Sequence, residues 1–155
     1  MKGEPKVIEY LNKGLRSELT AINQYFLHSR ICRNWGYARL ADYIHKESID
    51  EMKHADKLIE RILYLEGVPN IQRYNKVNVG ETVPEQFALD LALERAALQV
   101  LNDGLKLCRD HNDHGSEDLL RKILVAEEDH ADWLETQLGM IKEIGVENYL
   151  ARQVE

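Results

Sequence analysis

The sequence predicts an all-α protein, a four-helix bundle in which a long crossover joins the second helix to the third and a short fifth helix follows. Apolar residues recur with the helical period along four long stretches. Two connections between these stretches are short, and the middle one is long. Acidic and histidine residues interrupt the apolar stripes at matched positions. The length of 155 residues suits a single domain spanning 1–155.

The first two expected helices form a hairpin. The first should cover residues 5–34, because Pro5 is suited to the first turn of a helix. Residues 34–36, Asn-Trp-Gly, should form the turn. The second helix follows with a stripe from Leu40, and Gly67 with a proline two residues later should stop it.

The helical period lapses between residues 67 and 84, which contain two glycines and two prolines. Long loops are uncommon in compact domains unless they have a structural reason. A crossover that connects two parallel helices of a bundle provides such a reason. The third helix should therefore follow Pro84 and continue to Cys108.

The fourth helix should follow a second short turn at residues 111–115. Ser116 is expected to be its N-cap, since a serine hydroxyl can accept a hydrogen bond from a free backbone N–H at a helix start. Gly145 should end this helix, and residues 146–152 should form the short fifth helix.

The composition narrows the class of partner. A formal net charge of −7 argues against nucleic acid, whose phosphates require a basic surface, and is compatible with attracting cations. No signal-peptide core and no apolar run of about 18 residues is present, so we expect a cytoplasmic protein without membrane contact. Cys32 and Cys108 both lie on apolar stripes and are expected to be buried free thiols.

Six polar residues occupy positions that should face the core. Burying an unpaired carboxylate costs several kcal/mol or shifts its pKa until it is neutral. Four such acids in one core therefore require a shared cation. The six residues are Glu18, Glu51, His54, Glu94, Glu127 and His130.

The spacing of these residues shows two copies of one helical hairpin. Glu18 and Glu51 are 33 residues apart, and the same offset separates Glu94 from Glu127. An offset of 76 residues relates the first copy to the second, including the two histidines. The midpoints of both glutamate pairs fall at or near the expected turns. Folding each hairpin at its turn therefore brings all six side chains to one level.

Each copy supplies a lone Glu and then a Glu-x-x-His motif, whose two side chains lie one helical turn apart on nearly the same face. Chance alone would give about 0.7 such motifs in this composition, so the motif by itself is weak evidence. The matched offsets of 33 and 76 residues are the stronger evidence for a metal site. Oxygen and nitrogen ligands without sulfur favour iron or manganese over structural zinc. We expect Glu51 and Glu127 to bridge the two ions.

These residues resemble the di-iron carboxylate proteins, and longer strings resemble the bacterioferritin family, whose ferritin-like fold is the bundle described above. The resemblance covers nearly the whole chain. Its main strings are LTAINQYFLHS at 19–29, ESIDEMKHADKLIERI at 47–62, LEG at 65–67, DWLETQL at 132–138 and GVENYL at 145–150.

The resemblance implies iron storage and detoxification. Each subunit would be a ferroxidase that oxidises Fe(II) with O2 or H2O2 at its di-iron centre, with all six residues as catalytic metal ligands. The ferric mineral would be stored in a shell of 24 subunits arranged as two-fold dimers. A ferredoxin-type protein would be the reductant partner. Acidic residues such as Glu66 and Asp132 would guide the incoming ions near a subunit junction.

The resemblance also implies a b-type haem shared between two subunits. Its iron would be held by Met52 from each subunit, and non-haem relatives usually lack this methionine. Met52 follows Glu51 directly, so it should point about 100° away from the metal stripe towards the outside of the bundle.

Two further positions depend on the resemblance. Some members of the family have a histidine just before Glu47 that, with Asp50, binds an extra iron on the inner surface. Lys46 occupies that place here, which makes the inner-surface site doubtful because a charged lysine cannot be a metal ligand. Tyr25 matches a family tyrosine near the di-iron centre, either as an electron donor or as packing.

The remaining histidines are expected on the surface: His28 and His45 on helix surfaces or interfaces, and His111 and His114 in the second turn. Three other functions remain open. They are a peroxide-reducing di-iron protein, a haem-containing electron-transfer dimer without storage, and a helical interaction module with a structural metal.

Overall fold

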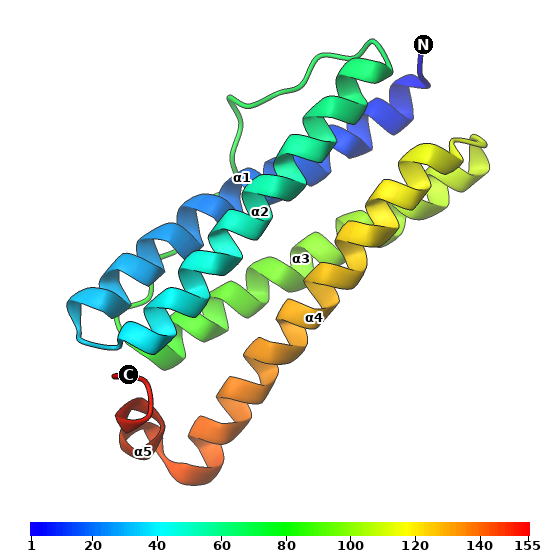
Figure 1. Ribbon diagram of the computed structural model, residues 1–155. Helices are drawn as coiled ribbons and strands as arrows, with labels where there is room; N and C mark the ends of the chain where they lie inside the picture. Colours follow the sequence, from blue (N-terminus) through cyan, green and yellow to red (C-terminus); the bar gives the residue numbers. More distant parts are fainter.

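The computed structural model describes residues 1–155, which form five helices and no strand. The first two helices make one hairpin, the next two make another, and the short last helix packs at one end (Figure 1). The helices are α1 (Pro5–Asn34), α2 (Ala38–Tyr64), α3 (Val83–Asp110), α4 (His114–Ile144) and α5 (Val146–Ala151). The predicted all-α bundle with a short fifth helix is therefore confirmed.

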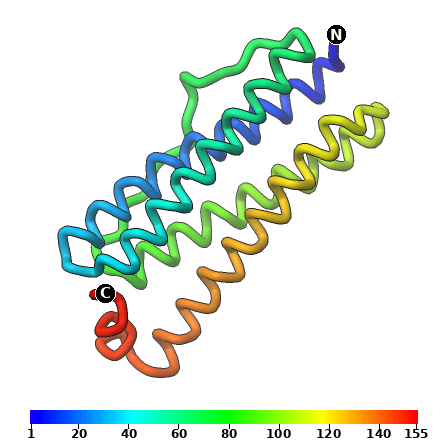
Figure 2. The backbone as a smooth tube through the Cα atoms, in the orientation of Figure 1, coloured from blue at the N-terminus to red at the C-terminus, as the bar shows by residue number.

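The crossover, residues 65–82, connects the two hairpins and returns along the length of the bundle beside α1. In Figure 2 the tube leaves α2 at the end that holds the N-terminus and reaches α3 at the opposite end. As a consequence α2 and α3 run in the same direction, as predicted for a crossover bundle. None of the helices has an apolar stretch of sufficient length to cross a lipid bilayer.

The crossover has no regular structure of its own and is fixed to α1 by its backbone. Four of its N–H groups donate hydrogen bonds of 2.9 to 3.1 Å to α1 side chains. The acceptors lie on one face of α1, and they follow one another in the same order as their donors along the crossover. The pairs are Asn70 with Asn12, Asn75 with Thr20, Asn78 with Gln24, and Gly80 with His28.

The start of α4 differs from the prediction. Asp113, and not Ser116, is the N-cap, and its carboxylate accepts hydrogen bonds from the backbone N–H (3.0 Å) and the hydroxyl (2.7 Å) of Ser116. Asp113 also binds Arg61 of α2 at 2.8 Å. Arg61 also donates to the Ser116 hydroxyl at 2.9 Å, so the carboxylate, the serine and the arginine form one hydrogen-bonded cluster at the start of α4.

The end of α2 shows why Gly67 is required. The residue with positive φ is Glu66 (φ 61°), and not the glycine after it. A Cβ at Gly67 would lie 2.7 Å from a methyl group of Ile8 and 3.0 Å from one of Ile62. Gly67 therefore permits close approach of the crossover to α1, while its N–H closes the helix on the Ile62 carbonyl at 2.9 Å.

The apolar core consists of two clusters of buried residues. One, of 12 residues, includes Tyr25, Phe87 and Leu134 and lies towards α5. The other, of 11 residues, includes Leu11 and Leu120 and lies towards the opposite end. Cys32 and Cys108 are buried free thiols, one in each cluster, as predicted. A polar layer therefore separates the two clusters.

Candidate metal centre

The polar layer contains the six residues singled out from the sequence. Five of them are at most 6% exposed, and the His54 side chain is 20% exposed. Every one of the four long helices contributes. The residues are Glu18 of α1, Glu51 and His54 of α2, Glu94 of α3, and Glu127 and His130 of α4.

The six side chains form two overlapping groups, in each of which the ligand atoms lie within 4.8 Å of one another. Glu51 and Glu127 belong to both groups. Each group takes three side chains from one hairpin and one glutamate from the other. The first group is Glu18, Glu51, His54 and Glu127; the second is Glu51, Glu94, Glu127 and His130.

Each histidine directs its Nδ1 atom at a carboxylate. His54 Nδ1 lies 3.1 Å from Glu127 Oε1, across the boundary between the two hairpins. His130 Nδ1 lies 3.0 Å from Glu94 Oε1 within the second hairpin. Imidazole nitrogens and carboxylate oxygens so close together are a donor set that suits a divalent metal ion.

Two carboxylate oxygens in the layer have no hydrogen-bond partner. Glu18 Oε2 and Glu94 Oε2 are fully buried, and no donor in the chain reaches either atom. Glu18 Oε2 lies 3.6 Å from His54 Nδ1, which is too long for a hydrogen bond. Buried oxygens of this kind are costly, and a cation shared by the six side chains would satisfy both. The residues therefore fit a pair of metal ions.

The electrostatics of the layer reflect four acids in one desolvated space. Burial raises the pKa of Glu94 to about 8 and that of Glu127 to about 7. Burial also raises the pKa of Glu51 above its ordinary value. The ordinary pKa of a glutamate is near 4.5, so at neutral pH Glu94 keeps its proton and Glu127 is about half protonated unless a cation replaces the proton.

The two histidines show the opposite balance. Burial alone would lower the pKa of His54, but hydrogen bonds with Glu127 and Glu51 raise it to about 10. The pKa of His130 is likewise raised, because its bond with Glu94 outweighs the effect of burial. Without metal, burial therefore favours protonated acids and the neighbouring carboxylates favour protonated imidazoles, and a metal ion bound to these groups would displace their protons.

Tyr25 lies beside the second group. Its hydroxyl donates a hydrogen bond to Glu94 Oε1, and its ring meets the His130 ring edge-on with centroids 5.2 Å apart. Burial raises the pKa of Tyr25 well above its usual value, so the hydroxyl keeps its proton. The expected proximity of this tyrosine to the six residues is confirmed.

Glu47 was not assigned to the site from the sequence. Its carboxylate lies 3.7 Å from His130 Nδ1. Glu47 also lines a pocket of about 460 Å³ with Asp50 and Asp129, which opens onto the layer at His54. The available signal was the position of Glu47, one helical turn before Glu51 on the same stripe. Lys46 is not among the residues of this pocket.

His28 is not a surface residue, contrary to the prediction. It is fully buried, and its Nδ1 lies 2.9 Å from Asp90 Oδ1, to which Gln24 also donates at 2.8 Å. The Gly80 N–H donates to Nε2 at 3.0 Å, so Nδ1 carries the proton and donates to Asp90. The other three histidines are exposed, as expected.

A bundle with a crossover and two overlapping carboxylate–histidine groups is the arrangement of a ferritin-like protein. A family model described as a ferritin-like domain matches residues 8–144. The bacterioferritin of Mycobacterium leprae is 49% identical over 154 residues, which cover 99% of this chain and 97% of that protein. The bacterial ferritin of Pseudomonas aeruginosa is 47% identical over 155 residues, covering 99% of this chain and 100% of the relative. The chain belongs to the bacterioferritin family.

Proposed function

We propose that this protein stores iron and oxidises Fe(II) to Fe(III) at the six-residue centre. The observation that supports this most directly is the pair of overlapping groups that share Glu51 and Glu127. Two shared carboxylates would hold two cations side by side, and such cations would satisfy the unpartnered oxygens of Glu18 and Glu94. The names of the relatives, bacterioferritin and bacterial ferritin, support iron as the metal.

In this proposal the two Fe(II) ions are substrates. Glu18 and His54 hold one, and Glu94 and His130 hold the other. Each ion loses one electron, and O2 takes up both electrons with two protons to give H2O2; alternatively, H2O2 takes them up to give water. Carboxylates suit both oxidation states because they are hard anionic ligands that can change their coordination mode.

In this proposal, carboxyl groups of the chain release protons when iron binds, and other acidic residues attract the iron. The raised pKa values of Glu94 and Glu127 mean that cation binding displaces protons from both carboxyls. Glu47, Asp50 and Asp129 give the adjoining pocket an acidic wall that attracts Fe(II). The acids expected to guide iron from outside, Glu66 and Asp132, lie exposed on the surface of the chain.

The test compares rapid Fe(II) oxidation, followed by absorbance of the ferric product, in three variants. Glu18→Gln and His130→Ala each remove one ligand and should abolish the rapid phase. Glu60→Gln changes an exposed glutamate of α2 and should oxidise iron at the original rate. Rapid oxidation that persists in both ligand variants would show that the centre is assigned wrongly.

We further propose that Met52 is an axial ligand of a haem shared with a second subunit. The Met52 side chain is 52% exposed and lies on the outer side of α2, beside Glu51. A thioether here is free to meet its counterpart across a two-fold axis. Protein purified with haem should show the visible spectrum of bis-methionine ligation. Met52→Leu should lose that spectrum while keeping rapid iron oxidation, and an unchanged spectrum would exclude Met52.

Storage also requires a shell, for which we propose 24 subunits built from two-fold dimers. Twenty-four chains of 18.0 kDa give a particle of about 430 kDa, which sizing chromatography resolves readily from a dimer. A dimer would instead favour an electron-transfer or peroxide-reducing protein without storage. A cytoplasmic location and a ferredoxin-type reductant complete the proposal.

A further inference from the structure

The contacts that fix the crossover to α1 are interrupted at one position. The acceptors on α1 are Asn12, Thr20, Gln24 and His28, which follow a four-residue interval with position 16 missing. Position 16 is an arginine, and a guanidinium has five donors and no acceptor. Arg16 therefore cannot receive a backbone N–H from the crossover.

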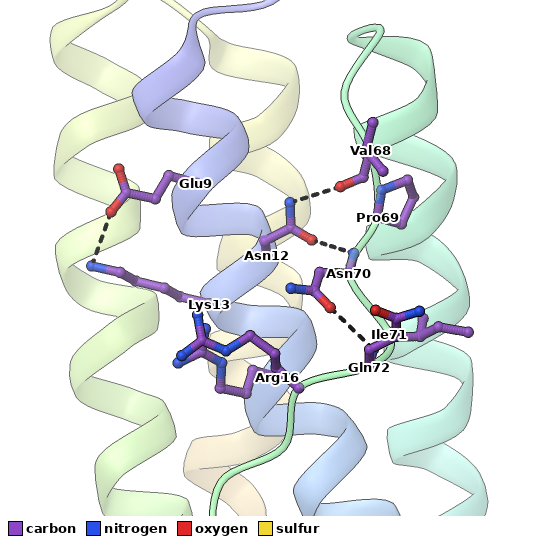
Figure 3. A pocket seen from close by; sticks show the side chains of 10 residues that line it. Glu9, Asn12, Lys13, Arg16, Val68, Pro69, Asn70, Ile71 and Gln72 are labelled. Carbon is purple, nitrogen blue, oxygen red and sulfur yellow. Dashed lines mark hydrogen bonds and ion pairs between the residues drawn. The ribbon is translucent and has the colours of Figure 1, made fainter.

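A pocket of about 650 Å³ opens where this contact is missing (Figure 3). Its walls are one face of α1 and the crossover from Val68 to Arg73. Asn12 joins the two walls, since its side chain bonds both the Val68 carbonyl (3.2 Å) and the Asn70 N–H (2.9 Å). These hydrogen bonds fix the distance between α1 and the crossover, so the pocket is part of the folded structure.

The charge of the pocket is positive. Three cations line it, Lys13, Arg16 and Arg73, against one acid, Glu9. Glu9 already pairs with Lys13 at 3.6 Å, whereas neither arginine has a carboxylate within 4.0 Å. The pocket is therefore locally basic, although the formal net charge of the whole chain is −7.

The backbone of the crossover adds donors at the same place. Between Asn70 and Asn75, the Gln72 N–H has an acceptor in the chain, the Asn70 side chain at 3.0 Å. The N–H groups of Ile71 and Arg73 have none. Free backbone N–H groups beside arginines form the donor set that phosphate oxygens prefer.

We propose that this pocket binds a small phosphate-type oxyanion between Arg16 and Arg73. The anion would occupy the place of the missing contact and link the crossover to α1 through its oxygens. The proposal does not depend on the metal centre, because none of the six residues of that centre lines the pocket.

Calorimetric titration of the iron-free protein with inorganic phosphate at low salt tests the proposal. Saturable binding of one phosphate per chain is expected. Arg16→Gln should weaken it about tenfold, as expected for one charge-assisted hydrogen-bonding group. This variant should also stay folded, because a glutamine at 16 can supply the missing acceptor. Arg73→Gln should weaken binding by a similar factor.

Lys106→Gln is the matched control, since Lys106 is an exposed cation of α3 outside the pocket. It should leave the affinity unchanged. Absence of saturable binding, or equal weakening by Lys106→Gln and Arg16→Gln, would overturn the proposal, because either result indicates general charge attraction. Titration with glycerol 3-phosphate distinguishes the source of the oxyanion. Weaker binding than phosphate indicates the free ion, and tighter binding indicates a phosphorylated molecule.

Discussion

The iron-free protein should lose stability as the pH rises from 5 to 8. Burial raises the pKa of Glu94 to about 8, whereas the unfolded chain releases that proton near 4.5. The folded state therefore binds more protons in this range, and the free energy of unfolding falls as pH rises. Glu127 acts in the same direction up to about pH 7, and the raised pKa of His54, about 10 against 6.5 in the unfolded chain, adds to the loss as the pH rises above about 6.5.

The contribution of Glu94 can be worked out by itself. A difference of one proton corresponds to about 1.4 kcal/mol per pH unit, so the interval from pH 5 to 8 costs roughly 4 kcal/mol. For a chain of this length, that is a fall of about 10 °C in the thermal midpoint. Glu94→Gln keeps the shape of the side chain and cannot ionise, so its midpoint should depend less on pH.

The assay is thermal unfolding by circular dichroism after iron removal with a chelator, at several pH values. Glu60→Gln, at an exposed position, should reproduce the original slope. Addition of Zn²⁺, which has no redox chemistry, should reverse the trend because its ligands must be deprotonated. The reasoning would be refuted by a Glu94→Gln slope equal to that of the unmodified protein.

Two further predictions concern buried contacts. Gly80→Ala should destabilise the protein by about 1–3 kcal/mol in chemical denaturation, because the new Cβ would lie 2.5 Å from the backbone nitrogen of Gln86. Gly139→Ala, with nothing within 4 Å, should instead stabilise by about 1 kcal/mol, and equal effects would contradict the steric argument. Tyr25→Phe should cost the iron-free protein about 2 kcal/mol by removing a buried donor to a carboxyl group. Tyr74→Phe, at a half-exposed position, should change stability by less than about 0.5 kcal/mol, and a similar loss in both variants would count against the role of the buried hydroxyl.

Much of the fold was predictable because it is periodic. The hairpins, the crossover and the level of the six residues all follow from the spacing of apolar and acidic residues along helices. The bounds of α1 agree with those predicted, and α5 ends within one residue of its expected end. The six residues converge because each hairpin has the same 33-residue spacing between its glutamates, so both pairs lie at the same level along the bundle.

The errors concern side chains whose partners are distant in the sequence. His28 has its acceptor 62 residues away at Asp90 and its donor 52 residues away at Gly80, neither of which a local stripe can reveal. At the start of α4, Asp113 caps the helix and Arg61, from another helix, binds both Asp113 and Ser116. A rule based on neighbouring residues alone does not include an arginine that comes from another helix.

The crossover and α1 contribute different groups to the hydrogen bonds that join them, so their sequences are constrained differently. The hydrogen bonds to α1 involve crossover backbone groups alone, so most side chains from Val68 to Val79 can be exchanged without loosening the segment. The path of the crossover depends instead on the acceptor side chains of α1 and on the absence of a side chain at Gly80. A long exposed strip of surface can therefore change its chemistry during evolution, or in the laboratory, while the buried carboxylate layer stays as it is.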